Sequence, residues 1–356
     1  MFGEFDILFL VMAFCGGIFG AAIGALPSFV LCGFGALIGS AVAMASQGAV
    51  STDIWITWGA FVGPQAAFAG GTAAAAYAKK IGIHDNGRDI CTSLLGLNNQ
   101  SVLLVGGAFG VLGALLTWGL SKLPAFTGGA LPEGAALGST NAIALAIIIC
   151  MILTRVLFGK TGVLGDVPKG KNRWISDDKG CWVPWQSDWG QVLLISFAVG
   201  LPAAYAALKN PHSGLLIFGF GCVSFIYLQY GTKIPVFHHI ALAAFFGATA
   251  TGSIYWGLAM AMICGFMCEV FAVLFVYHGD THIDPPTFAL TFMGTLQPLL
   301  LWTGVMPYGS TACECTPITF SVIVSIIFVL FFILIRRNKG SVEACGLNPE
   351  LAEETA

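Results

Sequence analysis

The chain has 356 residues, of which 57% are hydrophobic and 9% are charged, and its formal net charge is −3. Soluble domains carry about 25% charged residues, so this composition excludes an ordinary soluble protein and predicts an integral membrane protein. No basic patch suggests nucleic-acid binding. No phosphate-binding loop or catalytic motif indicates an enzyme or an ATP-driven pump.

Apolar stretches recur along nearly the whole chain and predict eleven membrane-spanning helices. Their approximate bounds are 5–24, 27–46, 57–78, 101–119, 139–158, 190–208, 213–230, 235–253, 256–277, 296–308 and 317–335. The fold class that follows is an all-α integral membrane protein.

Two apolar segments between these stretches are too short to cross a bilayer. They are "GRDICTSLLGLNN" (87–99) and "PPTFALTFMGTLQ" (285–297). Backbone that does not span is tolerated at membrane depth only where protein or a water-filled cavity surrounds it. We therefore predict that each segment forms a short re-entrant half-helix.

Clusters of Lys and Arg follow the third, fifth and eleventh stretches. If the amino terminus lies outside, all three clusters fall on the cytoplasmic side, as the positive-inside rule requires. This predicts a multi-pass protein of the inner (plasma) membrane with a cytoplasmic carboxyl terminus. The clusters are Lys79, Lys80 and Arg88; Arg155, Lys160, Lys169, Lys171, Arg173 and Lys179; and Arg336, Arg337 and Lys339.

The order of features in the first half of the chain recurs in the second half, which predicts an internal repeat. The predicted units are a five-helix repeat (1–158), a cytoplasmic loop with a linker helix (159–212), a second five-helix repeat (213–340) and a polar tail (341–356). One linker helix favours parallel repeats, whereas one false span would make them inverted. The matched positions include Pro27 with Pro235, Trp58 with Trp256, Gly96 with Gly294, and Asn99 with Gln297.

Side-chain amides within apolar surroundings are the predicted solute-binding groups, because an unpaired amide in hydrocarbon costs several kcal/mol. They are Asn98, Asn99, Gln100, Gln297 and Gln65. Small or helix-breaking residues beside them are expected to shape the pathway. These are Gly63, Pro64, Gly96, Gly294 and Pro298.

Glu269 is the one acidic residue that the pattern places well inside a predicted span. Such a residue is a candidate for ion coupling, and a protonated structural role is the alternative. The alternating residues His278, Asp280, His282 and Asp284 would share one side of an extended segment, as a cation site requires. A solvated turn is favoured there, so we predict no metal and no cofactor.

Two stretches, "GALPSFVLCGF" (24–34) and "GPQAAFAGGTAAAAYAKK" (63–80), carry a resemblance to known proteins. The segment from residue 16 to residue 110 resembles uncharacterised prokaryotic polytopic membrane proteins that are described as permease-like. The resemblance implies a prokaryotic inner-membrane protein, and it implies no substrate and no catalytic residue.

The leading functional hypothesis is a secondary transporter for a small polar solute, either a facilitator or ion-coupled, with its site between the repeats. One alternative is a passive channel for a small neutral solute or ion. Another is a membrane subunit of a larger complex that has no transport activity alone. The expected partners are the solute and membrane lipid, and homo-oligomerisation stays open.

Overall fold

The computed structural model describes residues 6–50, 57–123, 138–170, 172–174, 182–307, 309, 321–327 and 329–330. Within these residues the chain is all-helical, with no strand. The tail 341–356 and about half of the predicted span 317–335 lie outside them. The helices are α1 (Ile7–Ile23), α2 (Ala25–Ala45), α3 (Ala67–Lys80), α4 (Gln100–Leu120), α5 (Gly138–Phe158), α6 (Trp189–Lys209), α7 (Leu216–Val223), α8 (Phe225–Gln229), α9 (His238–Thr251), α10 (Ile254–Phe275) and α11 (Pro285–Trp302).

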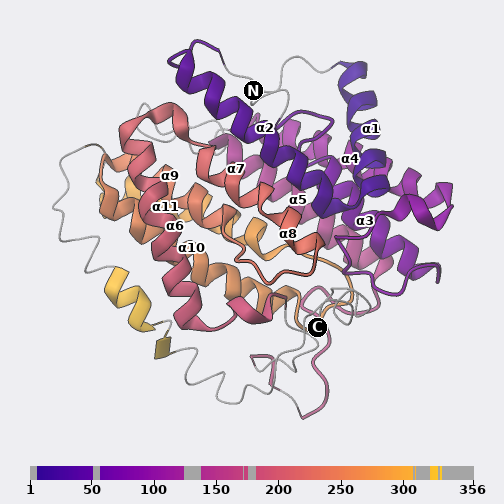
Figure 1. Ribbon diagram of the computed structural model, residues 1–356. Helices are drawn as coiled ribbons and strands as arrows, with labels where there is room; N and C mark the ends of the chain where they lie inside the picture. The colour runs from indigo at the N-terminus through magenta and orange to yellow at the C-terminus, as the bar shows by residue number, and fades with distance from the viewer. Residues whose placement is uncertain are drawn as a thin grey trace.

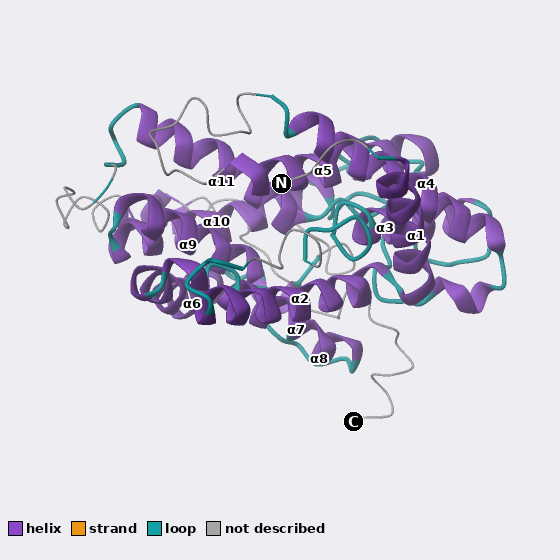
Figure 2. Ribbon diagram, turned by 90° about the horizontal axis from the view of Figure 1, so that it is seen from above, coloured by secondary structure: helices purple, strands orange, loops and turns teal. Residues whose placement is uncertain are grey.

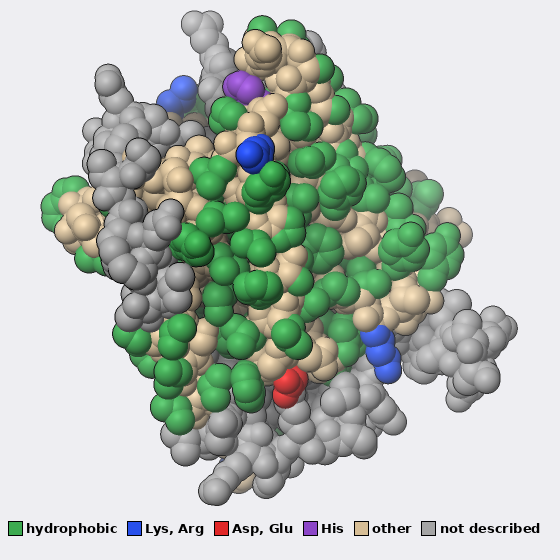
Figure 3. Space-filling model, turned by 60° about the vertical axis from the view of Figure 1, so that its left-hand side comes forward, with side chains coloured by type: hydrophobic (Ala, Val, Ile, Leu, Met, Phe, Trp, Pro, Cys, Tyr) green, Lys and Arg blue, Asp and Glu red, His purple; other side chains and the backbone are tan. Residues whose placement is uncertain are grey.

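Five helical segments of the described chain are long and apolar enough to cross a membrane, fewer than the eleven predicted spans. They are α2, α4, α6, α10 and the run Pro211–Gln229, which contains α7 and α8. A broad apolar band covers the face in Figure 3, and the charged side chains visible there lie toward its two ends. These features fit a multi-pass membrane protein.

The helices gather into two clusters of three. Helices α1, α3 and α4 pack against one another at one end of the molecule, and α6, α9 and α10 do so at the other (Figures 1 and 2). Glycines allow the close approach in the first cluster. A Cβ atom on Gly17 of α1 would lie 2.1 Å from the carbonyl oxygen of Gly106 in α4.

Two pairs of helices join the clusters. Helix α2 packs on α7, and α5 packs on α11. A Cβ atom on Gly33 would lie 2.5 Å from the Cβ atom of Cys222, so α2 and α7 touch where only a glycine fits. The core therefore continues from one cluster to the other through these four helices.

Helices α3 and α9 are shorter than the rest of their clusters, with 14 residues each. At 1.5 Å per residue each is about 21 Å long, less than the hydrocarbon thickness of about 30 Å. Non-helical segments, 57–66 and 230–237, lead into them. Most of the first segment is buried, and the Gln65 side chain donates from Nε2 to the carbonyl oxygen of Trp58 at 2.7 Å. This bond satisfies backbone that the helix leaves unpaired.

Both predicted re-entrant half-helices are wrong. Segment 87–99 is an irregular loop with one 3₁₀ turn, η1 (Leu94–Leu97), in which only Leu94 is buried. Segment 285–297 is the beginning of α11, a continuous helix of 18 residues that contains Pro298 and ends at Trp302. Thr, Gly and Gln lower the hydropathy of this segment without ending its helix. Helices α3 and α9, in contrast, each begin after a non-helical segment, inside a stretch (57–78 or 235–253) that the sequence pattern predicted as one span. We call these two the interrupted helices.

Candidate functional site

A cavity of about 130 Å³ lies where the two helix clusters meet, at the amino-terminal ends of α3 and α9. This volume holds several waters or a small molecule. Its walls come from α2, α3, α5, α7, α8, α9 and α11, from the segments that precede α3, α9 and α11, and from the loop segments 88–91 and 182–185. The apolar lining includes Leu26, Phe29, Trp58, Pro64, Phe68, Ile143, Ala144, Ile147, Phe218, Phe225, Leu242 and Leu290.

Aromatic rings surround the imidazole of His238 in one wall. The ring centroids of Phe29, Phe225 and Phe218 lie 5.1, 5.4 and 5.9 Å from that of His238, all edge to face. Such contacts fix the orientation of the ring without using its nitrogens. The wall therefore offers a small polar spot within an apolar surface.

The first turn of α9 carries polar groups that lack partners. Phe237 precedes the helix and makes no side-chain cap. Among the described residues, Nδ1 of His238 and both ring nitrogens of His239 are buried and make no hydrogen bond. A helix amino terminus also attracts negative charge and hydrogen-bond acceptors. This end of the cavity therefore favours a ligand that carries an acceptor.

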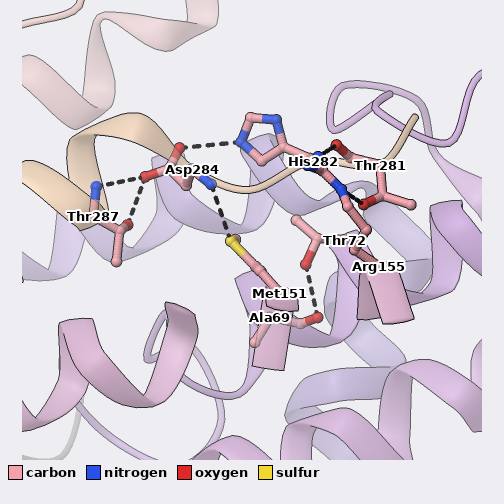
Figure 4. Close-up of polar contacts among 8 residues, drawn as sticks. All are labelled: Ala69, Thr72, Met151, Arg155, Thr281, His282, Asp284 and Thr287. Atoms are coloured by element: carbon pink, nitrogen blue, oxygen red, sulfur yellow. Dashed lines mark hydrogen bonds and ion pairs between the residues drawn. The ribbon is translucent and has the colours of Figure 1, made fainter. Parts of the chain in front are cut away.

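A buried histidine–aspartate pair that lines the cavity lies at the start of α11 (Figure 4). Nε2 of His282 lies 3.1 Å from Oδ1 of Asp284. Oδ2 of Asp284 accepts from the backbone N–H and the hydroxyl of Thr287 at 2.9 and 2.5 Å. Burial raises the pKa of Asp284, but hydrogen bonds from His282 and Thr287 outweigh burial and hold the pKa below its ordinary value. Asp284 is therefore a carboxylate at neutral pH.

Arg155 of α5 holds the loop that carries this pair. Its guanidinium is buried and donates to the carbonyl oxygen of Thr281 at 2.5 Å and to that of Phe275 at 2.6 Å. Nε also donates to the Thr281 hydroxyl at 2.9 Å (Figure 4). A Cβ atom on Gly279 would lie 2.3 Å from this guanidinium, so the loop needs a glycine there. The sequence analysis used Arg155 only as a member of a basic cluster that sets the orientation in the membrane.

The segment 182–187 covers one side of the cavity and is bonded to the segment that leads into α9. The Gln186 side chain donates to the carbonyl oxygen of Val236 at 2.9 Å and accepts from its N–H at 2.6 Å. Nε1 of Trp185 donates to the carbonyl oxygen of Ile234 at 2.7 Å. These three bonds join the two segments into one cover.

The sequence matches the family of unknown function DUF7973 twice, over residues 2–174 and over residues 169–314. The chain belongs to this family. No curated protein and no solved structure matches it. In this DUF7973 chain the first match contains α1 to α5 and the second contains α6 to α11. The match names no permease, so the permease-like resemblance stays a prediction.

The predicted amides of the DUF7973 chain do not gather at the cavity. Asn98 and Gln100 are exposed, and Asn99 caps α4 by accepting from the N–H of Ser101 at 3.0 Å. These three residues form the polar beginning of a helix, as helix caps commonly do.

The other two amides are buried in separate places. Gln297 donates to the carbonyl oxygen of Ala243 at 3.0 Å and is not part of the cavity lining. Gln65 lies beside the cavity-lining residue Pro64, but its amide is bonded to Trp58. Gln297 therefore satisfies a backbone carbonyl of α9, and Gln65 satisfies one in the segment before α3.

Of the residues predicted to shape the pathway, some lie at the cavity and others do not. Pro64 lines the cavity and Gly63 precedes it, whereas Gly96 is exposed in η1. Gly294 and Pro298 lie inside α11, outside the cavity lining.

Glu269, the predicted coupling residue, is buried on α10 and accepts a hydrogen bond from the hydroxyl of Tyr277. It is not part of the cavity lining. The structure therefore separates this acid from the polar groups of the cavity.

The alternating residues 278–284 do not form a cation site. His278 faces the carbonyl oxygen of Arg173, and Asp280 accepts from the backbone N–H of Lys160. Only His282 and Asp284 face each other. Across the described residues, no group of three or more His, Cys, Asp and Glu side chains could hold a metal ion.

Proposed function

We propose that this protein is a membrane transporter for a small solute that binds in the cavity between two inverted five-helix repeats. The observation that carries the proposal is the pair of interrupted helices, α3 and α9, which both begin at the cavity. Interrupted helices that meet at an interface between repeats are a recurrent way to build a solute site in transporters.

The packing supports a repeat that pairs α1 with α6, α2 with α7, α3 with α9, α4 with α10, and α5 with α11. Each contact within the first set has a counterpart in the second, and the pairs α2–α7 and α5–α11 pack on each other. Two consecutive matches to one family support the same division. In this register α6 is the first helix of the second repeat and not a linker.

The direction of the helices supports an inverted arrangement. Helices α3 and α5 end together, where Lys80 Nζ donates to the carbonyl oxygen of Leu157 at 2.7 Å. Their ends lie beside the end of α10, because Arg155 donates to the carbonyl oxygen of Phe275. The counterpart of α3, α9, ends at the opposite end of α10, since α10 begins three residues later. We call the shared end of α3, α5 and α10 the basic end.

The basic end is the proposed cytoplasmic side. It carries Lys79, Lys80, Arg88 and Lys160, which satisfies the positive-inside rule. Helix α1 also ends here, since the Ser93 hydroxyl donates to the carbonyl oxygen of Ala22 at 2.5 Å. The amino terminus is then outside.

In this mechanism the solute replaces water in the cavity and places its polar group toward the amino-terminal end of α9. Because the first turn of α9 is uncapped and the surrounding walls are aromatic, the best fit is a small solute with one acceptor group and an apolar body. Separation of the cover, segments 182–187 and 230–237, would open the cavity toward the basic end. A rocking motion of the inverted repeats would open the other side.

A cavity-filling variant tests the proposal. Ala144 lines the cavity on α5, and Ala144→Leu should occupy space that the solute needs. Ala108→Leu adds the same side chain at an exposed position of α4 and is the matched control. Purified protein would be heated with a chemically diverse set of small solutes, and hits would be followed by uptake into proteoliposomes.

A solute present at 100 times its Kd should stabilise the wild type by about 2.7 kcal/mol. The stabilisation and the uptake should persist in Ala108→Leu and be lost in Ala144→Leu. Equal binding by both variants, or no solute that stabilises or crosses, would overturn the proposal.

A further inference from the structure

The charges that line the cavity do not balance. Arg88 contributes one positive charge against the two carboxylates of Asp89 and Asp284, which leaves a net charge of −1 when the imidazoles are neutral. A net charge in a small, mostly apolar cavity is costly, so such a site favours one bound positive charge. The described residues offer no metal site to supply it.

Two imidazoles line the same cavity and can each accept a proton: His282 and His238. His282 is the better placed, because its Nε2 lies 3.1 Å from the Asp284 carboxylate while both side chains are buried. The second carboxylate oxygen is already bonded to Thr287. Oδ1 is therefore left to stabilise an imidazolium at His282.

The other charged groups near the His282–Asp284 pair are bonded to other partners. Asp89 pairs with His84, Nε2 to Oδ2 at 3.2 Å, and Asp280 is bonded to Lys160 and Thr161. Arg155 donates to backbone carbonyls and to Thr281, and Arg88 donates to the carbonyl oxygen of Val276.

His238 is the second titratable group that faces the cavity with the pair, from α9. Its Nδ1 has no partner among the described residues, so it is available to the solute. The two imidazoles thus divide the polar chemistry of the cavity, one beside a carboxylate and one beside an uncapped helix.

We propose that the His282–Asp284 pair binds the proton that is coupled to solute transport. The proposal rests on the transport function above and assigns its coupling ion. With Nε2–H donating to Asp284, the incoming proton binds at Nδ1 of His282, and the net charge of the lining changes from −1 to zero. The proton leaves from the same atom when the cavity opens to the opposite side of the membrane.

Arg155 links the proton-binding pair in the second proposed repeat to α5 of the first. It extends from α5 of the first repeat and holds the carbonyl oxygen of Thr281, the residue before His282 in the second repeat. Relative motion of the repeats therefore changes the surroundings of the pair. Glu269 has no such position, because it is bonded to Tyr277 outside the cavity.

The test uses the proton itself as the probe, so it needs no identified solute. Proteoliposomes on a solid-supported membrane would receive a rapid pH step, and proton entry into the buried pair should give a transient current. His282→Gln keeps a donor toward Asp284 but cannot be protonated, and it should lose the current. His84→Gln changes an imidazole that also pairs with an aspartate, Asp89, but that is not itself part of the cavity lining, and it should keep the current.

Wild-type protein with ¹⁵N-labelled histidine supplies a second measurement that does not depend on a variant folding. The chain has only six histidines, so one resonance that titrates with the current can be assigned to His282. A current that survives in His282→Gln, or a His282 resonance that never titrates while the protein is folded, would overturn the proton site. Failure of the solute screen with the proton current intact would instead overturn the transport function.

Discussion

The two halves of the molecule share a packing scheme but differ in the chemistry at their interrupted helices. Before α3, Gln65 is bonded to Trp58, and the N–H of Ala67 donates to the carbonyl oxygen of Gly63 at 3.0 Å. Before α9 the backbone is bonded by Gln186, which comes from another segment, and the imidazoles of His238 and His239 in the first turn keep nitrogens without a hydrogen bond. The two helix starts therefore differ in their polar groups although the helices around them pack in the same way.

The largest effect is expected when the side chain that joins the two halves, Arg155, is removed. Arg155→Met should destabilise the protein by about 3 kcal/mol or more, because several buried acceptors lose their donor at about 1–3 kcal/mol each. Thermal unfolding in detergent would measure the loss. Lys160→Met removes an exposed cation nearby and should change the midpoint little. Equal midpoints for the two variants would contradict the joining role of Arg155.

A second prediction separates a structural polar group from a functional one. Gln65→Ala should cost about 1–3 kcal/mol, because it leaves the buried carbonyl of Trp58 unpaired. His238→Met should change stability by less than about 1 kcal/mol, since it replaces an imidazole whose buried Nδ1 makes no hydrogen bond by an apolar side chain. The measurement is the unfolding midpoint of each variant beside its solute binding.

Solute binding should be lost in His238→Met and retained in Gln65→Ala at temperatures where that variant stays folded. The reverse pattern, a stable Gln65→Ala and an unfolded His238→Met, would show that the halves do not differ in this way.

The smallest expected effect concerns the two His–Asp pairs. Burial raises the pKa of Asp89, but hydrogen bonds from His84, Thr92 and Cys91 prevail and lower it, and the pKa of Asp284 is also lowered. A carboxyl whose folded pKa is below its unfolded value, about 3.9, stabilises the fold above that pH. Stability should therefore fall as the pH drops from about 4 through the folded pKa values.

Unfolding midpoints between neutral and acid pH would measure this loss. Asp284→Asn should reduce the dependence of the midpoint on acid pH more than Asp89→Asn. The side chain of Asp284 is slightly more buried, at 9% exposed against 12% for Asp89, and Asp284 also caps α11 whereas Asp89 caps no helix. A slope that neither substitution changes would contradict the assignment.

Several features of the fold were predictable from local sequence. Low charge and long apolar runs identify a membrane protein, and most predicted spans in the described residues coincide with helices. Hydropathy could not identify the interrupted helices, because segment 57–66 is buried and apolar whether or not it is helical. The opposite error occurred at 285–297, where polar residues lie within a continuous helix.

The candidate site was less predictable, because polarity alone does not say where a side chain points. Asn98, Asn99 and Gln100 attract attention in the sequence, yet they begin a helix at the surface. His238 stood near a predicted helix start and His282 in a predicted solvated turn, and both line the cavity.

The assignment to membrane proteins follows from the amino-acid sequence, since lipid accepts only apolar surfaces and backbone whose hydrogen bonds are satisfied. The candidate site, in contrast, depends on how the helices pack. Phe29, His238 and His282 lie in three separate parts of the chain, and they share one cavity because α2, α9 and the loop before α11 pack together. Such contacts depend on the shape of whole helices, which no local pattern of residues records.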